Sequence, residues 1–232
     1  MIKKDKIFGG VHMGFTIFIL LFTIIFGFIT VFLGLPFWLF IAAVIGVSLA
    51  RTFYVIHILY RSQDVKKIGH FLQSSAKNPL YHYTLSLKSG SKQAQLQAID
   101  LVLGAYKSPL IQGMYRSSRA MLEHDYSAAK TFAAQIPDEM MRSYTLALIA
   151  AANGEVTVDD HMLQKPWMSS IIAATRSYKK GDMTEFERHK QETLAKSRGI
   201  QYFSNFYYLE RIHENIKVSK RKKTKRGAAS AS

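Results

Sequence analysis

Residues 7–50 read IFGGVHMGFTIFILLFTIIFGFITVFLGLPFWLFIAAVIGVSLA and contain no charged side chain. A helix needs about 20 apolar residues to cross the roughly 30 Å hydrocarbon core of a bilayer. This stretch is about twice as long as one such span, and Gly34-Leu35-Pro36 interrupts it with residues that break helices. The pattern predicts a transmembrane helical hairpin, with helices over about 8–33 and about 36–60.

Basic residues flank this predicted hairpin on both sides, whereas the turn has none. They are Lys3, Lys4 and Lys6 before it and Arg51, Arg61, Lys66 and Lys67 after it. Lys and Arg are enriched on the cytoplasmic side of membrane proteins. We therefore expect a multi-pass protein of a bacterial-type inner (cytoplasmic) membrane with both termini in the cytoplasm. A cleaved signal peptide is the alternative for the first run, but that run is longer than the usual apolar core of about 7–15 residues.

Small residues recur at helical spacing in both predicted spans. They are Gly10 and Gly14 in the first span and Ala42, Gly46 and Ala50 in the second. Small residues let transmembrane helices approach closely, so this stripe either packs the hairpin on itself or docks another integral membrane protein. Arg51 lies about 22 Å from the turn. It either reaches the headgroups with its long side chain or pairs with an acid on such a partner.

The chain of 232 residues has a net charge of +15 and no cysteine. The absence of cysteine excludes disulfides, thiolate metal sites and cysteine catalysis. The sequence has no phosphate-binding loop, zinc-protease motif, nucleophile elbow or EF-hand. Asp159-Asp160-His161 is better explained as an acidic helix start than as a metal site, because consecutive helical residues point in different directions. We expect no enzyme activity, cofactor or metal, with an enzyme built from distant residues as an alternative.

Helical patterns continue almost throughout the region after residue 60, which has the size of one soluble domain. Ser91 and Asp182 are candidate N-caps. The breaks between the patterns lie at Pro79, Pro109, Pro137 and Pro166 and at Gly90, Gly154, Gly181 and Gly199. Only Tyr81–Leu87 (YHYTLSL) resembles a strand, and it is short enough to be helical. The predicted helices cover 62–75, 79–88, 91–106, 109–123, 126–136, 138–152, 158–164, 167–179, 183–197 and 200–219.

Three segments of the second half share one outline, in which a short polar corner separates two helices. The corners are 123–126, 153–156 and 180–183, so equivalent points lie 30 and 27 residues apart. YRSSRAMLEHDYSAAKTFAAQIP (115–137) and AATRSYKKGDMTEFERHKQETLAKSRG (173–199) show the pattern best. Over about 110–199 the chain resembles the tetratricopeptide repeat family, whose period is about 34. Tyr126, Ala129 and Ala133 match that family after the corner, whereas Phe186 replaces its small residue. The resemblance implies stacked antiparallel helix pairs with a concave face.

Stacking would bury the apolar faces of these helix pairs. The predicted core comprises Ile111, Met114, Leu122, Phe132, Ile136, Met141, Tyr144, Leu148, Ile171, Ile172, Phe186 and Leu194. The aromatic segment 200–217 is expected to be a capping helix, although its aromatic side chains are alternatively a surface for a partner or the membrane interface.

Basic residues dominate two further segments of the chain. One is 61–107, which follows the hairpin directly, and the other is the tail 217–226, which is expected to be disordered. For a tethered protein the nearest polyanion is the inner leaflet, so we expect anionic lipid headgroups rather than nucleic acid as its ligand. The candidate residues for contact with lipid or a partner are Lys66, Lys67, Lys220, Arg221, Lys222, Lys223, Lys225 and Arg226.

The predicted fold class is all-α, with a hairpin (1–60), a basic juxtamembrane segment (61–107), a repeat-like domain (108–216) and a tail (217–232). We expect an accessory subunit that binds and stabilises or regulates a larger membrane enzyme or transporter, for instance in the synthesis of envelope polymers or lipids. The alternatives are a lipid-binding protein that acts alone and a transporter component. A second copy of the chain is an alternative partner.

Overall fold

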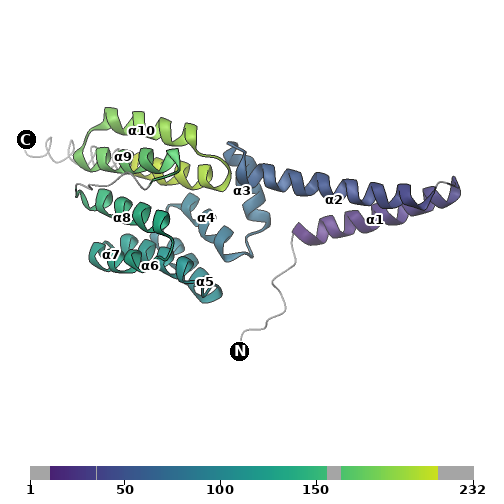
Figure 1. Cartoon of the computed structure of the whole chain (residues 1–232), viewed down its shortest axis with the longest axis horizontal. Helices are drawn as coiled ribbons and strands as arrows, with labels where there is room; N and C mark the ends of the chain where they lie inside the picture. Colours follow the sequence, from purple (N-terminus) through teal and green to yellow (C-terminus); the bar gives the residue numbers. More distant parts are fainter. Residues whose placement is uncertain (1–10, 35, 156–162, 214–232) are drawn as a thin grey trace, which may run out of the picture.

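The computed structural model describes residues 11–34, 36–155 and 163–213, with only the backbone for 11–20 (Figure 1). Within these ranges the chain is helical between turns, and no described residue lies in a strand. The predicted all-α class is therefore confirmed. The helices are α1 (Val11–Phe32), α2 (Phe37–Tyr60), α3 (Val65–Ser74), α4 (Pro79–Ser89), α5 (Lys92–Ala105), α6 (Pro109–Glu123), α7 (Tyr126–Ala134), α8 (Glu139–Asn153), α9 (Pro166–Lys180), α10 (Met183–Lys196) and an unlabelled last helix, 199–213.

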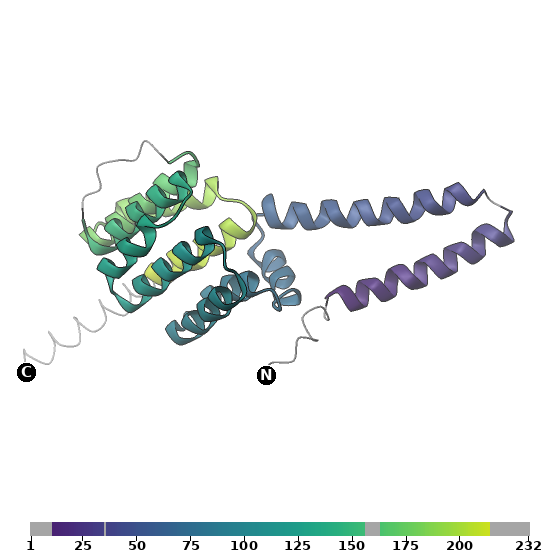
Figure 2. The same cartoon turned by 60° about the horizontal axis from the view of Figure 1, so that its bottom comes forward.

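Helices α1 and α2 form a projecting antiparallel pair that stands away from the other helices (Figures 1 and 2). They pack near their turn, where the rings of Phe26 and Phe40 stack with centroids 6.3 Å apart. Gly27 faces Phe40, whose ring would lie 3.7 Å from a Cβ added at that glycine. The buried hydroxyl of Thr30 donates to the Gly27 carbonyl over 2.8 Å, which satisfies its polar group inside an apolar helix.

Helix α2 is long and apolar enough to cross a membrane, as judged by its length and composition. Its large side chains are exposed: Phe37, Trp38 and Phe53 each expose more than three fifths of their surface. Among the residues with described side chains, α1 contributes only a shorter apolar stretch, Leu21–Phe32. A single candidate span is thus found, and the two-span hairpin stays a prediction.

The other helices form a stack, here called the helical stack (65–213), in which neighbours along the chain pack against one another. Each predicted helix that falls on described residues is present, with ends that differ by a few residues. The segment 81–87 lies in α4, which confirms the prediction that it is helical. Most of the predicted helix 158–164 lies outside the described residues, and Leu163 and Gln164 are not helical.

Local signals account for many helix ends in the helical stack. The Ser91 hydroxyl accepts a hydrogen bond from the Ala94 amide, and the Asp182 carboxylate accepts one from the Glu185 amide. Both residues are therefore the N-caps that the sequence predicted. The glycines predicted at the breaks adopt the left-handed conformation: Gly90, Gly154, Gly181 and Gly199.

The core of the stack contains more alanine than the sequence analysis expected. Buried Ala120, Ala129 and Ala133 surround Ile136 and Ile149 where α6, α7 and α8 meet. Four predicted core residues are buried: Ile136, Ile171, Ile172 and Phe186. Met114, Phe132, Met141, Tyr144 and Leu148 are partly buried against the clusters. Ile111, Leu122 and Leu194 are only half-buried and belong to none of the described clusters, so they are not core residues.

Helix direction alternates from α4 to α8, but α8 and α9 run the same way, with both starting at the end nearer the hairpin (Figures 1 and 2). Helix α10 then returns to the end of α2 near Tyr60, here called the foot of α2. The last helix leaves that foot and runs between α3 and α4 on one side and α9 and α10 on the other. It therefore closes the stack rather than extending it.

Candidate membrane and partner interface

The junction between the apolar pair and the helical stack depends on a contact between distant parts of the chain. The Gly199 amide donates to the Ser62 carbonyl over 2.7 Å. A Cβ at Gly199 would lie 1.8 Å from the Leu59 carbonyl oxygen, and this residue has a φ of +59°. Only glycine fits this close approach of two backbones. The last turn of α2 and the start of the last helix are therefore held face to face.

Two side chains reinforce this junction. The side-chain amide of Gln63 donates to the carbonyls of Leu194 (2.9 Å) and Ser197 (3.0 Å), which ties the turn after α2 to the end of α10. The ring of Phe203, fully buried, packs against Ile58 of α2 and Leu72 of α3. A short linker and a shared core thus pack the end of α2 against the stack.

The last helix also contacts the far helices of the stack. The Lys190 ammonium lies 2.7 Å from a Glu210 carboxylate oxygen, and the hydroxyls of Thr175 and Tyr208 are 3.3 Å apart. Arg211 donates to the Leu87 carbonyl of α4 over 2.5 Å. The predicted capping helix thus joins α2, α4, α9 and α10 in one body, and its buried aromatic residue Phe203 serves packing.

The predicted small-residue stripe lies on the outside of α2. Ala42, Gly46 and Ala50 are exposed, and no described atom lies within 4 Å of a Cβ added at Gly46. Among the described residues, the hairpin packs through Gly27 rather than through this stripe. Gly14 lies in the part of α1 whose side chains are not described, and Gly10 lies outside the described residues. The described contacts do not support the interpretation that this stripe packs the hairpin on itself.

The predicted basic residues are divided between described and undescribed parts. Arg51 lies in α2 with a half-buried side chain, and Lys66 and Lys67 lie exposed in the first turn of α3. Asp64 caps that turn by accepting from the amides of Lys66 and Lys67, which holds the pKa of its carboxyl below the usual value. The tail residues Lys220, Arg221, Lys222, Lys223, Lys225 and Arg226 lie outside the described residues.

Several tyrosines are partly buried in the described part of the stack. Burial raises the pKa of Tyr83, Tyr115, Tyr144 and Tyr208. Their hydroxyls therefore stay protonated near neutral pH and act as hydrogen-bond groups rather than bases. The described residues include no group of three or more His, Asp or Glu side chains that could hold a metal ion. Asp159, Asp160 and His161 lie outside them.

No local pattern in the sequence predicts the junction formed by Ser62, Gln63, Gly199 and Phe203. The sequence predicts Gly199 as a helix break, but nothing in the sequence predicts its contact across more than 130 residues.

Comparisons of the chain with protein-family models, curated proteins and solved structures find no match.

Proposed function

We propose that this protein is a membrane-anchored adaptor: an accessory subunit that holds a tetratricopeptide-like helical stack at a fixed place beside a larger membrane enzyme or transporter. The observation that carries the proposal is the junction at Gly199, which joins an exposed apolar helix directly to a packed stack. A flexible tether would serve for anchoring alone. A packed junction suits a protein that positions its partner.

Aromatic residues at both ends of α2 support a membrane crossing by this helix. Trp38 lies in its first turn and Tyr60 ends it, about 33 Å apart at a rise of about 1.5 Å per residue. Both rings are exposed, and aromatic residues are enriched at the two interfaces of a membrane. In this proposal α1 and α2 form a hairpin in the inner membrane. Its uncharged turn lies on the outer side of that membrane, and its basic flanks lie on the cytoplasmic side.

The partner in this proposal is an integral membrane protein that contacts the stripe of Ala42, Gly46 and Ala50. The stripe is open toward the surroundings of α2, and small residues allow a second helix to approach closely. Arg51 follows the stripe by one residue, so an acid at matching depth on the partner would pair with it.

Gly46→Leu tests this contact, because the open space at Gly46 lets the variant keep the hairpin intact. A photo-crosslinker at Ala42 in native membranes should capture one stoichiometric membrane protein. Gly46→Leu should abolish that product while the amount of inserted protein is unchanged. Gly34→Leu at the turn is an unsuitable control because of its positive φ, whereas Ile45→Leu on the neighbouring face is suitable. A product that persists in Gly46→Leu would refute the docking face.

A lipid-binding protein that acts alone is the second candidate. The exposed Lys66 and Lys67 at the foot of α2 favour it. The two proposals separate in native membranes solubilised in mild detergent: a lone lipid binder elutes as a single chain, and an accessory subunit elutes with a stoichiometric partner.

A further inference from the structure

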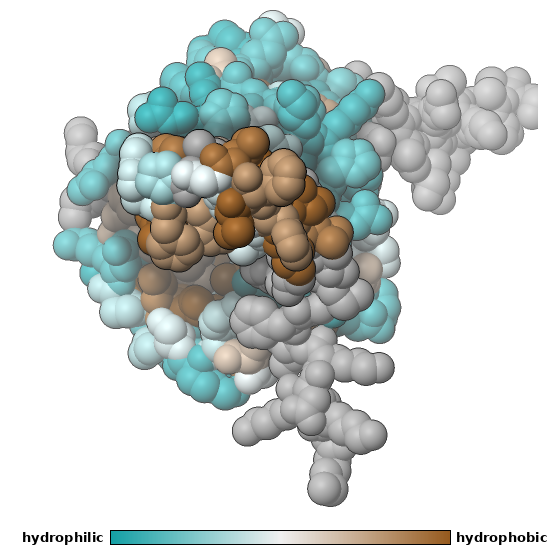
Figure 3. Space-filling view, turned by 90° about the vertical axis from the view of Figure 1, so that its right-hand side faces the viewer, coloured by the Kyte–Doolittle hydropathy of each residue, from teal (hydrophilic) through white to brown (hydrophobic). Residues whose placement is uncertain are grey.

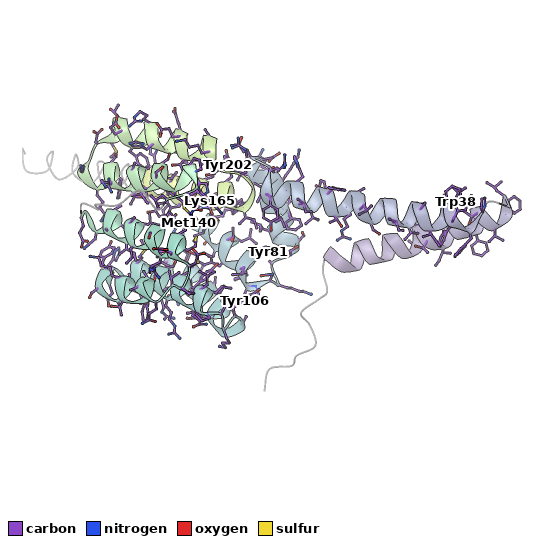
Figure 4. All side chains as sticks on the ribbon, in the orientation of Figure 1. Trp38, Tyr81, Tyr106, Met140, Lys165 and Tyr202 are labelled. Carbon is purple, nitrogen blue, oxygen red and sulfur yellow. The ribbon has the colours of Figure 1, made fainter. Side chains whose placement is uncertain are left out.

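One end of the helical stack faces the hairpin, and we call it the hairpin end. Tyr81, Tyr106, Met140, Lys165 and Tyr202 all lie toward this end (Figure 4). Figure 3 looks along the hairpin onto it and shows the apolar hairpin rising from a surface that is mostly hydrophilic. If α2 crosses a membrane, this is the surface that meets the headgroups.

Most turns at the hairpin end carry an exposed cation. These cations come from four different turns and from the start of α9, so they do not form a sequence motif. They are Arg61, Lys77, Lys107, Lys165 and Arg198.

Contacts within the stack place several of these turns side by side. The Tyr106 hydroxyl lies 3.3 Å from the Asn78 side-chain oxygen, which joins the turn that carries Lys107 to the turn that carries Lys77. Arg198 precedes Gly199, whose amide bonds to Ser62 next to Arg61. Lys77 and Lys107 therefore lie on adjoining turns, and so do Arg61 and Arg198.

Helix α3 extends this surface, because it turns away from the line of α2 and crosses the end of the stack (Figure 1). Its buried side, Ile68 and Leu72, packs into the core. Lys66 and Lys67 lie exposed on its other side. The hairpin end thus presents at least seven cations among the described residues.

Acidic residues are few at the hairpin end and more frequent at the opposite end. Asp64 and Asp138 use their carboxylates to cap α3 and α8, and Glu139 follows Asp138. The opposite end mixes four exposed lysines with several acids. Its lysines are Lys88, Lys92, Lys179 and Lys180, and its acids include Glu123, Asp125, Glu155 and Asp182. Among the residues that the structure describes, positive charge is therefore concentrated at the hairpin end and balanced by acids at the other.

We propose that the hairpin end binds anionic phospholipid headgroups of the membrane that α2 enters, so that the stack lies with this end flat on the bilayer. The proposal rests on the membrane anchoring proposed above. The occupant follows from charge complementarity and from continuity with α2, because the surface begins where the apolar helix ends. Each cation near an anionic surface contributes roughly fivefold in affinity, and their sum would fix the orientation of the stack.

The test uses the full chain in nanodiscs of phosphatidylcholine alone or mixed with phosphatidylglycerol. The chain has no cysteine, so one dye can be placed at Ser108→Cys at the hairpin end or at Ser127→Cys at the opposite end. Energy transfer to a headgroup-labelled lipid reports the distance from the bilayer. We expect transfer from position 108 to rise with phosphatidylglycerol and to fall back in high salt, and transfer from position 127 to stay low.

Charge-matched variants identify the residues. K77Q/K107Q/K165Q/R198Q should lose the response to phosphatidylglycerol, whereas K88Q/K92Q/K179Q/K180Q, which removes four cations from the other end, should keep it. Equal transfer in both lipids, or equal loss in both variants, would overturn the inference and leave the anchoring intact. A chain that does not co-elute with the discs would overturn the anchoring and the inference together.

Discussion

The apolar pair α1–α2 and the helical stack are both built from helices, but they treat apolar side chains in opposite ways. In the pair, Phe28 exposes 74% of its surface and Phe32 exposes 90%. In the stack, Phe186 and Phe203 are almost fully buried, and alanines fill the closest helix contacts. The stack buries its apolar side chains away from water, whereas α2 leaves them exposed and is long and apolar enough to cross a membrane.

Among the variants that distinguish the stack from the apolar pair, Phe203→Ala should have the largest effect on the stability of the stack. The ring is fully buried where the two regions meet, so its loss should lower the free energy of unfolding of the stack by about 3–5 kcal/mol. Urea unfolding in detergent measures this through Trp167 fluorescence, in a Trp38→Phe background. The same truncation at exposed Phe28 should leave the transition unchanged. A similar shift for both variants would remove the distinction between the regions.

Leu49→Arg should affect the pair alone. An arginine near the middle of a span raises the apparent free energy of insertion by about 3 kcal/mol relative to leucine, so less protein should enter the membrane. Carbonate extraction of membranes measures the inserted fraction, with Leu49→Phe as the control. Because Leu49 is exposed, the unfolding of the stack should not change. A destabilised stack would show that α2 is a core helix of the soluble domain.

Gly199→Ala should weaken the junction between the regions. A left-handed conformation costs a non-glycine residue about 1–3 kcal/mol, and here the added Cβ also meets the Leu59 backbone. Gly181→Ala is the matched control, because it has a similar φ of +78° and open space around its Cβ. Hydrogen exchange of the Gly199 region and urea unfolding should show the larger loss for Gly199→Ala. Equal losses would mean that the close approach is not made.

Two glycines sharpen the comparison further with smaller effects. In the stack, a Cβ at Gly113 would lie 2.7 Å from Cγ1 of Ile136, so Gly113→Ala should cost about 1–3 kcal/mol by overpacking. In α2, Gly46→Ala meets open space and should be neutral or slightly stabilising, since alanine favours helices by about 0.5–1 kcal/mol over glycine. Thermal unfolding in detergent distinguishes the two, and destabilisation by Gly46→Ala would place that residue in a contact.

Helix positions in this chain could be predicted because their signals are local. Pro109 and Pro166 begin helices, while Gly154 and Gly181 end them, and each acts through its own backbone geometry. The apolar run of α2 could be recognised for the same reason. The alanine core was underestimated because alanine contributes little to a hydrophobic pattern, even where it allows helices to pack closely.

The candidate site was predicted only in part. The exposed stripe of α2 and the basic start of α3 could be read from residue spacing and flanking charge. The junction could not, because Gln63 and Leu194 are 131 residues apart, and the hairpin-end cations are brought together only by the order in which the helices stack. Such surfaces depend on tertiary contacts that no local pattern contains.

The most direct test of the account is cysteine accessibility across the membrane in a chain that has no native cysteine. Leu33→Cys places a thiol at the exposed tip of the pair, and Ser127→Cys places one on the exposed surface of the stack. We predict that a membrane-impermeant maleimide labels position 33 in intact spheroplasts and labels position 127 only after the membrane is opened. Labelling of position 127 in intact spheroplasts, or of both positions only after opening, would contradict an apolar pair that crosses the membrane and a stack that stays inside.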